Sequence, residues 1–272
     1  MLLAEDFRAI ARDALRGRWL RAVGVGLLAG LLGAGIDGAS VSINSDNLDS
    51  AAALFQSDFF FRYRIFFMIG GAMFLVYLLV RLVIGGAATL GYARYNLGLV
   101  DGKDPDVTEL FSQFHRIWPG FCLQFLRGLY TFLWSLLFVI PGIIAEYRYA
   151  MAAYILAENP EMTAGEAITR SKELMAGNKL RLFCLGFSFI GWVLLCAAPI
   201  ILFGGIAAGP MAVGSTGAVI ALFAIGTLLS YICLMFLTPY MEAANAAFYR
   251  DISRPAAEPE QAEEMSLPQQ IF

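Results

Sequence analysis

The sequence predicts an all-α membrane protein: a bundle of about six transmembrane helices with both termini in the cytoplasm. Hydrophobic residues make up 59% of the 272 residues and charged residues only 15%, with a mean hydropathy of +0.67. Those charged side chains are too few to cover the surface of a water-soluble protein of this length. In addition, residues 182–241 form one run without a charged side chain, which is long enough for two crossings of a bilayer.

Apolar runs define the predicted transmembrane domain, residues 19–252. The predicted spans are residues 19–36, 65–90, 118–140, 142–157, 182–204 and 217–240. The fourth follows the helix-breaking pair Pro141-Gly142 and covers only about 24 Å as a helix, less than the hydrocarbon thickness. A re-entrant segment, or one buried deep in the bundle, therefore stays open for residues 142–157.

The distribution of Lys and Arg predicts the orientation. With six spans, the segments on the predicted cytoplasmic side contain fourteen of these residues, whereas the outer segments contain only Arg62 and Arg64. Cytoplasmic loops carry such an excess of positive charge. We therefore expect both termini on the cytoplasmic side.

The two ends of the chain differ in character. Residues 1–18 predict an amphipathic helix at the membrane surface, with Arg8, Arg12 and Arg16 facing anionic lipid headgroups. A signal peptide is the alternative, but the acidic residues in this segment and the missing Ala-x-Ala site disfavour it. Residues 253–272 are rich in Glu and Pro and predict a disordered acidic tail.

A second amphipathic helix is predicted at residues 163–176, on the cytoplasmic side. Thr163 and Glu166 have the spacing of a capping box, in which each side chain accepts a hydrogen bond from the other residue's backbone N–H. One face of this helix is apolar or small, and Gly177 follows its end. The sequence leaves open whether this face contacts lipid or a partner.

Small residues recur every fourth position along the first span, at Ala22, Gly26, Gly30 and Ala34. Such an edge lets two helices approach closely. Packing within the chain is one interpretation, and association with a second copy or with a partner membrane protein is the other.

Ionisable residues inside spans mark candidate functional positions. The candidates for a polar cleft are Glu146, Arg148, Arg127 and Arg81. Arg81 and Arg127 can extend toward the cytoplasmic interface, whereas Glu146 and Arg148 follow a Pro-Gly break and point to different sides of one helix. We expect Glu146 to pair with a cation on another helix, either lining a cleft or fixing the helix register.

No metal, cofactor or catalytic site is predicted. The four cysteines lie in apolar spans, where thiols behave as small hydrophobic groups, and His115 is the only histidine. A net charge of −3 and the lack of a long basic segment also exclude a nucleic-acid partner.

Tyrosines followed by small residues mark the second helix of each predicted hairpin, at Tyr92, Tyr147 and Tyr240. An internal repeat would produce this pattern. Aromatic anchors at the membrane interface would produce it as well.

Several ordered motifs carry a family resemblance. They are Ala11-x-x-Ala14-Leu15-x-Gly17-x-Trp19, Ile140-Pro141-Gly142-Ile143-Ile144, Tyr147-x-Tyr149-Ala150-Met151, Leu156-Ala157-Glu158-Asn159-Pro160, Glu166-Ala167-Ile168, Ser171, Leu174-Met175-x-Gly177-Asn178-Lys179, Phe187-Ser188-Phe189-Ile190-Gly191-Trp192, Thr238-Pro239-Tyr240 and Ala247-Phe248-Tyr249. Over most of residues 5–252 the chain resembles the bacterial integral-membrane family known as domain of unknown function 975. More distantly, it is similar to the membrane domain of some glycerophosphodiester phosphodiesterases. The resemblance implies a multi-pass protein of the bacterial cytoplasmic membrane and no particular activity.

Three functional hypotheses follow. The first is a non-enzymatic scaffold or a membrane component that binds lipid, peptide or a partner. The second is a small transporter or permease subunit with a polar cleft near Glu146 and Arg148. The third, an intramembrane lipid-modifying enzyme, ranks last because the chain has no nucleophile or paired-carboxylate motif.

Overall fold

The computed structural model describes residues 2–34, 58–208 and 216–253. Within these ranges every regular element is a helix, which confirms the predicted all-α class. In chain order they are α1 (Ala4–Leu15), α2 (Trp19–Leu32), α4 (Asp58–Val100), α5 (Thr108–Phe111), η1 (Phe114–Arg116), α6 (Ile117–Leu137), α7 (Val139–Tyr149), α8 (Ala152–Glu158), α9 (Ala164–Leu174), α10 (Lys179–Phe187), α11 (Ile190–Ala208) and α12 (Thr216–Ser253). The predicted tail, residues 253–272, lies outside the described residues apart from its first.

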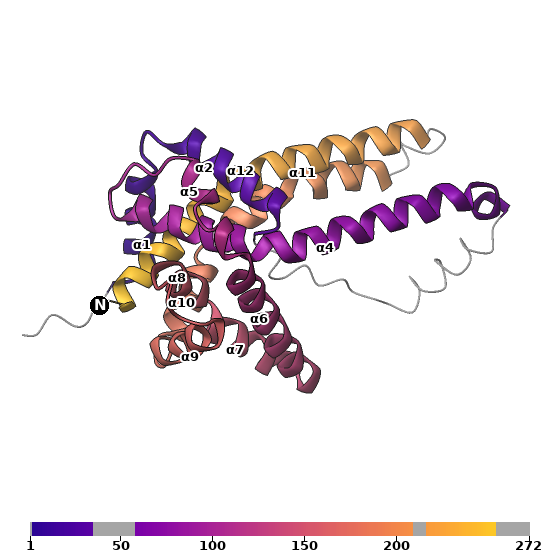
Figure 1. Ribbon diagram of the computed structural model, residues 1–272. Coiled ribbons are helices and arrows are strands. Elements are labelled where there is room, and N and C mark those ends of the chain that lie inside the picture. Colours follow the sequence, from indigo (N-terminus) through magenta and orange to yellow (C-terminus); the bar gives the residue numbers. More distant parts are fainter. Residues whose placement is uncertain (1, 35–57, 209–215, 254–272) are drawn as a thin grey trace, which may run out of the picture.

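The helices form a compact part from which apolar helices project (Figure 1). In the compact part α1 and α2 pack on α12, while α5 and α8 pack on α4. The first half of α4 and the α11–α12 hairpin project to one side, and the α6–α7 hairpin projects in a different direction (Figure 1). The long helices α4 and α12 therefore belong to both regions.

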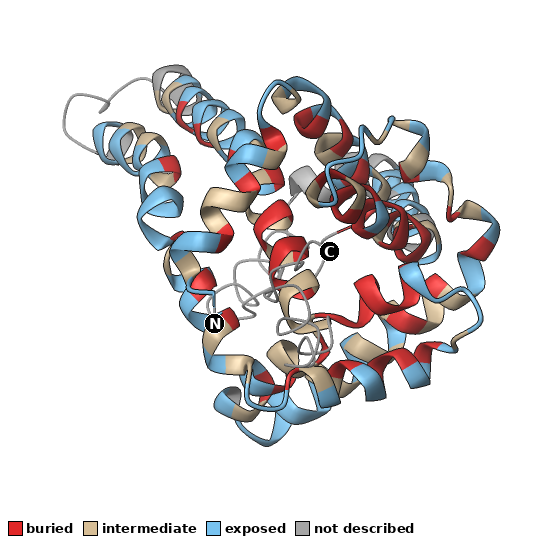
Figure 2. Ribbon diagram, turned by 90° about the vertical axis from the view of Figure 1, so that its left-hand side faces the viewer, coloured by how far each residue is buried: buried red, intermediate tan, exposed pale blue. Residues whose placement is uncertain are grey.

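The core occupies the compact part. Its largest fully buried side chains include Phe7 of α1, Tyr95 of α4, Phe248 of α12 and Phe189, which lies between α10 and α11. Every residue from Ala152 to Ala157 is buried as well. Figure 2 shows buried residues on the faces that the helices turn toward one another. By contrast, most large apolar side chains on the projecting helices are exposed.

Glycines allow the helices of the compact part to cross closely. A Cβ atom added at Gly86 of α4 would lie 2.2 Å from the carbonyl carbon of Gly120 in α6. One added at Gly91 would lie 1.9 Å from the backbone oxygen of Leu110 in α5. Both distances are far shorter than real Cβ contacts, so any side chain at these positions would separate the helices.

Helix α1 forms where an amphipathic helix is predicted, but its apolar face contacts protein. Phe7, Ala11 and Leu15 are buried, and the ring of Phe7 meets that of Phe248 in α12 at a centroid distance of 5.3 Å. The Arg181 guanidinium lies over both rings. Sequence periodicity identifies the apolar face but not its partner, and here α12 takes the place expected of lipid.

The fourth predicted span, residues 142–157, is divided in the structure. The helix break lies at Phe138, which has an extended backbone, and Pro141 falls in the first turn of α7, where a missing N–H costs no hydrogen bond. α7 ends at Tyr149, and α8 packs on α4 and α9. Protein surrounds α8, whereas Ile143 and Ile144 of α7 are exposed, so the two parts of this apolar segment have different surroundings.

The predicted helix at residues 163–176 forms as α9. Both hydrogen bonds of the capping box between Thr163 and Glu166 are present. The predicted face is buried against α6, α7 and α8, and the Ser171 hydroxyl donates to the carbonyl of Arg148 at 2.8 Å. The apolar face of α9 is thus used for packing within the chain.

Two helical segments in the described ranges are long and apolar enough to cross a membrane, Lys179–Ile206 and Ala221–Ser253. Only 11% and 17% of their most apolar windows are buried, so they differ from core helices of water-soluble proteins. These features suggest membrane association. The six-span bundle is not confirmed by them and stays a prediction.

The α11–α12 hairpin has two cross-links that the sequence analysis did not predict. Cys196 and Cys233 form a disulfide, although the sequence predicted free thiols, because their separation of 37 residues gives no pairing signal. Beside Pro199, the backbone N–H of Ile200 donates to the Ser230 hydroxyl at 3.2 Å. Both contacts hold the two projecting helices together.

Candidate functional site

A cavity of about 550 Å³ lies in the compact part, between α2, α4, α6, α7, α8, α10 and α12. Small residues of α2 leave this space open. Gly26 and Gly30 of α2 line the cavity together with Ala34, which lies just beyond the end of α2. These are three of the four residues in the predicted packing edge, and the fourth, Ala22, is buried outside the cavity. The predicted packing edge therefore faces the cavity along much of its length.

One side of the cavity is polar. We call this the polar wall, and it consists of Tyr92, Tyr154, Glu242 and Asn245. The Tyr154 hydroxyl donates to a carboxylate oxygen of Glu242 at 3.1 Å. The hydroxyl oxygen of Tyr92 is buried and has no hydrogen-bond partner within the described part of the chain. Polar groups held in an apolar interior cost free energy unless something satisfies them.

Glu146 of α7 and Arg127 of α6 also line this cavity. The Glu146 side chain is half-buried and forms no hydrogen bond or ion pair with a described residue. The expected pairing of Glu146 with a cation on another helix is therefore not observed in the described ranges. Its carboxylate remains open to a molecule inside the cavity.

The two other predicted cleft residues lie outside this lining. Arg81 donates a hydrogen bond to the carbonyl of Gly30 at 2.8 Å and lies over the ring of Tyr77. Its positive charge therefore stabilises the carboxyl end of α2. Arg148 follows Glu146 by two positions and, as its helical spacing predicts, points elsewhere. The structure thus brings together Glu146 and Arg127 but not Arg148 or Arg81.

Sequence reasoning missed most of the polar wall. Glu242 ends the long charge-free run of residues 182–241, and that position was the available signal. The sequence pattern indicated an internal repeat or interfacial anchors at Tyr92 and Tyr147, yet both residues line the cavity. Tyr240, the third tyrosine of that pattern, instead packs against Trp19 and Phe189.

The cavity opens through exposed residues on four helices. These lining residues, which we call the mouth, are Gly30, Ile143, Gly186 and Thr238. Each of them is followed in sequence by, or lies one helical turn from, a large exposed apolar residue. These apolar residues are Leu31, Ile144, Phe187 and Leu234. A molecule that enters the cavity therefore passes an apolar surface before it meets the polar wall.

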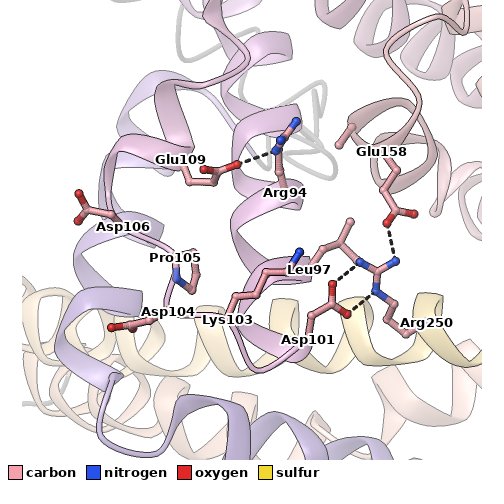
Figure 3. Close-up of a pocket in the computed structure, with 12 residues that line it drawn as sticks. Arg94, Leu97, Asp101, Lys103, Asp104, Pro105, Asp106, Glu109, Glu158 and Arg250 are labelled. Carbon is pink, nitrogen blue, oxygen red and sulfur yellow. Dashed lines mark hydrogen bonds and ion pairs between the residues drawn. The ribbon is translucent and has the colours of Figure 1, made fainter.

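A second pocket, also of about 550 Å³, lies at the charged end of the compact part (Figure 3). Arg250 of α12 donates to both carboxylate oxygens of Asp101, at 2.8 and 2.6 Å, and pairs with Glu158 of α8. Arg94 and Glu109 form a more exposed pair in the same pocket. The first group ties together the carboxyl ends of α4, α8 and α12, which gives it a structural role.

Tyr249 extends the Arg250 group. Its hydroxyl donates to Glu158 at 2.7 Å, and its ring stacks on Tyr154 of the polar wall. Burial is the main cause that raises the pKa of Tyr249 well above its usual value, and the hydrogen bond to Glu158 raises this pKa further. Burial lowers the pKa of Arg250, but its hydrogen bonds to Asp101 and Glu158 outweigh burial and raise it. The network thus favours a neutral tyrosine beside a charged arginine.

Comparison with known proteins finds one family. Residues 136–256 match a family model described as "Protein of unknown function (DUF975)". No curated protein and no solved structure matches the chain. The family match is narrower than the predicted resemblance over residues 5–252, and no finding supports the similarity to glycerophosphodiester phosphodiesterases. The matched residues include Glu146, Tyr154 and Glu242, so most of the cavity lining lies within the matched domain of unknown function.

Proposed function

We propose that this protein is a multi-pass, non-enzymatic protein of the bacterial cytoplasmic membrane that binds a membrane lipid in the central cavity. One observation carries the proposal: the cavity combines a polar wall with a mouth surrounded by exposed apolar side chains. An amphipathic molecule matches both parts of this lining. A water-soluble ligand would have to cross the apolar surface at the mouth.

The arrangement of the projecting helices supports a location in the bilayer. Exposed apolar side chains cover α6, α11 and the first part of α12, where water would be an unfavourable solvent. The charged groups around Arg250 and Asp101 gather at the opposite end, which we assign to the cytoplasmic face. In this orientation the six predicted spans cross or enter the membrane. After α6 crosses outward, α7 and α8 bring the chain back to the cytoplasmic side.

The arginines of α1 fit the same orientation. Because Phe7, Ala11 and Leu15 are used for packing on protein, the face with Arg12 and Arg16 is exposed. We assign that face to anionic headgroups at the cytoplasmic surface. A second copy or a partner membrane protein remains the proposal for the exposed faces that lipid does not cover.

Blocking the mouth tests lipid binding. Gly30 is exposed and a Cβ there meets nothing within 4 Å, so Gly30→Phe fills the mouth without a clash at its Cβ. Gly24 is equally exposed and open on the same helix but does not line the cavity, which makes Gly24→Phe a matched control. We expect native mass spectrometry in mild detergent to find one retained lipid on the parent and on Gly24→Phe, and none on Gly30→Phe. Lipid retained equally by both variants, or by none of the three proteins, would contradict the proposal.

A small transporter or permease subunit is the second candidate. The half-buried Glu146 carboxylate favours it, because ionisable groups inside a membrane commonly line a transport path. A cysteine placed at Ala150, which lines the cavity, distinguishes the two, in a background without Cys122 and Cys184. Labelling by a membrane-impermeant reagent from both sides of sealed vesicles would favour transport. Labelling from neither side would favour a cavity that opens only to lipid.

A further inference from the structure

We infer that the central cavity selects a primary ammonium group, so that the bound lipid carries an amine-bearing headgroup. This inference rests on the proposed function and names its ligand class. It starts from the charges of the lining, which are two carboxylates, Glu146 and Glu242, and one guanidinium, Arg127. The described lining therefore has an excess of one negative charge, which attracts a cation and repels an anionic headgroup.

The Tyr92 hydroxyl is an independent observation pointing to a ligand. The Tyr92 side chain is only 8% exposed, and its hydroxyl has no hydrogen-bond partner among the described residues. That oxygen would lie 3.1 Å from a Cβ atom at Gly26, another lining residue, so it faces the glycine wall of the cavity. A buried hydroxyl without a partner is costly, and a bound donor would remove the cost.

Hydrogen-bond chemistry distinguishes a primary from a quaternary ammonium. A primary ammonium has three N–H donors, whereas a trimethylated one has none. Tyr92 and the open Glu146 carboxylate both offer hydrogen-bond acceptors to a molecule in the cavity. The rings of Tyr92, Tyr147 and Tyr154 add π-faces that attract either cation. The cavity should therefore bind an ammonium that carries N–H donors more tightly than one that carries positive charge alone.

The test compares three lipids with identical short acyl chains: phosphatidylethanolamine, phosphatidylcholine and phosphatidylglycerol. Each is titrated onto delipidated full-length protein in mild detergent and followed by native mass spectrometry. We expect phosphatidylethanolamine to bind about ten-fold more tightly than the other two, the size of one charge-assisted hydrogen bond. Tighter binding of phosphatidylglycerol, or equal binding of all three, would overturn the ammonium inference and leave lipid binding intact. If none of the three bound, the proposed function itself would fail.

Two variants separate charge from hydrogen bonding. Glu146→Gln removes one lining carboxylate, and Tyr92→Phe removes only a hydroxyl that has no described partner, so neither breaks an observed contact. We expect each to weaken phosphatidylethanolamine binding by about five-fold or more. Phosphatidylcholine binding should weaken only in Glu146→Gln, which removes a charge, and should stay unchanged in Tyr92→Phe. Glu161→Gln, at an exposed position away from the cavity, is the control. An unchanged preference in both variants would overturn the inference. If free ethanolamine competed for the cavity as effectively as phosphatidylethanolamine does, the ammonium group would not need to come from a lipid, and that part of the inference would be wrong.

Discussion

The two halves of α4 and α12 show one helix serving two environments. Toward the far end of each projection, side chains such as Ile65, Met73, Leu228 and Leu229 are exposed and large. In the compact part the same helices bury many small residues, such as Ala87 and Ala243, between larger ones. Small residues allow close protein packing, whereas large apolar ones need a solvent that is itself apolar. The contrast predicts that mutations of similar size will have opposite consequences in the two halves.

The largest effect is expected where α4 crosses α6. Gly86→Ala places a methyl group 2.2 Å from the backbone of Gly120, which cannot move like a side chain. We expect a loss of about 3 kcal/mol or more in the free energy of unfolding, or no folded protein, because overpacking against backbone forces the helices apart. Thermal unfolding in detergent and the monodisperse yield on size exclusion measure it.

The matched control is Gly70→Ala in the projecting half of the same helix, where a Cβ meets nothing within 4 Å. Alanine should be neutral there or stabilise the helix by up to about 1 kcal/mol, through its higher helix propensity. Equal losses at Gly70 and Gly86 would remove the distinction between the two halves.

The same contrast explains which features the sequence could predict. Composition and charge-free runs report the solvent of each segment, so the helical class, the α11–α12 hairpin and the capping box at Thr163 were predicted correctly. Apolar periodicity in α1 and α9 does not distinguish lipid from protein as the buried partner. For that reason the packing of Phe7 on Phe248 was not foreseen.

The cavity was only partly predictable for a related reason. Glu146 and Arg127 stood out because charges within apolar runs are rare, and the structure places both in one lining. Tyr92 and Tyr154 did not stand out, because tyrosine is common in membrane helices and its role depends on what lies opposite. Their neighbours Gly26 and Glu242 come from helices about 66 and 88 residues away in sequence, beyond the reach of any local pattern.

A smaller effect is expected from the charged groups that close the compact part. Arg250 makes two hydrogen bonds to Asp101 and a further pair with Glu158, all largely shielded from solvent, so Arg250→Gln should cost about 2 kcal/mol of unfolding free energy. Arg94 lies in the same pocket (Figure 3), but it is half-exposed and pairs with Glu109 alone. Arg94→Gln should therefore cost no more than about 0.5 kcal/mol. Chemical unfolding of both variants measures the difference, and equal costs would show that burial of the Arg250 group contributes nothing.

The smallest effect concerns the free energy of unfolding at alkaline pH. Because the pKa of Tyr249 is raised in the folded protein, folding favours the protonated hydroxyl, and this stability is fully present below the unfolded pKa of about 10. Above it, the parent should lose up to about 1.4 kcal/mol per pH unit through this one group. Tyr249→Phe loses the hydrogen bond to Glu158 but cannot ionise, so its stability relative to the parent should improve by about 1 kcal/mol from pH 10 to pH 11. Unfolding midpoints over that range measure the difference. Parallel curves for the parent and Tyr249→Phe would show that this hydroxyl is not protected by folding.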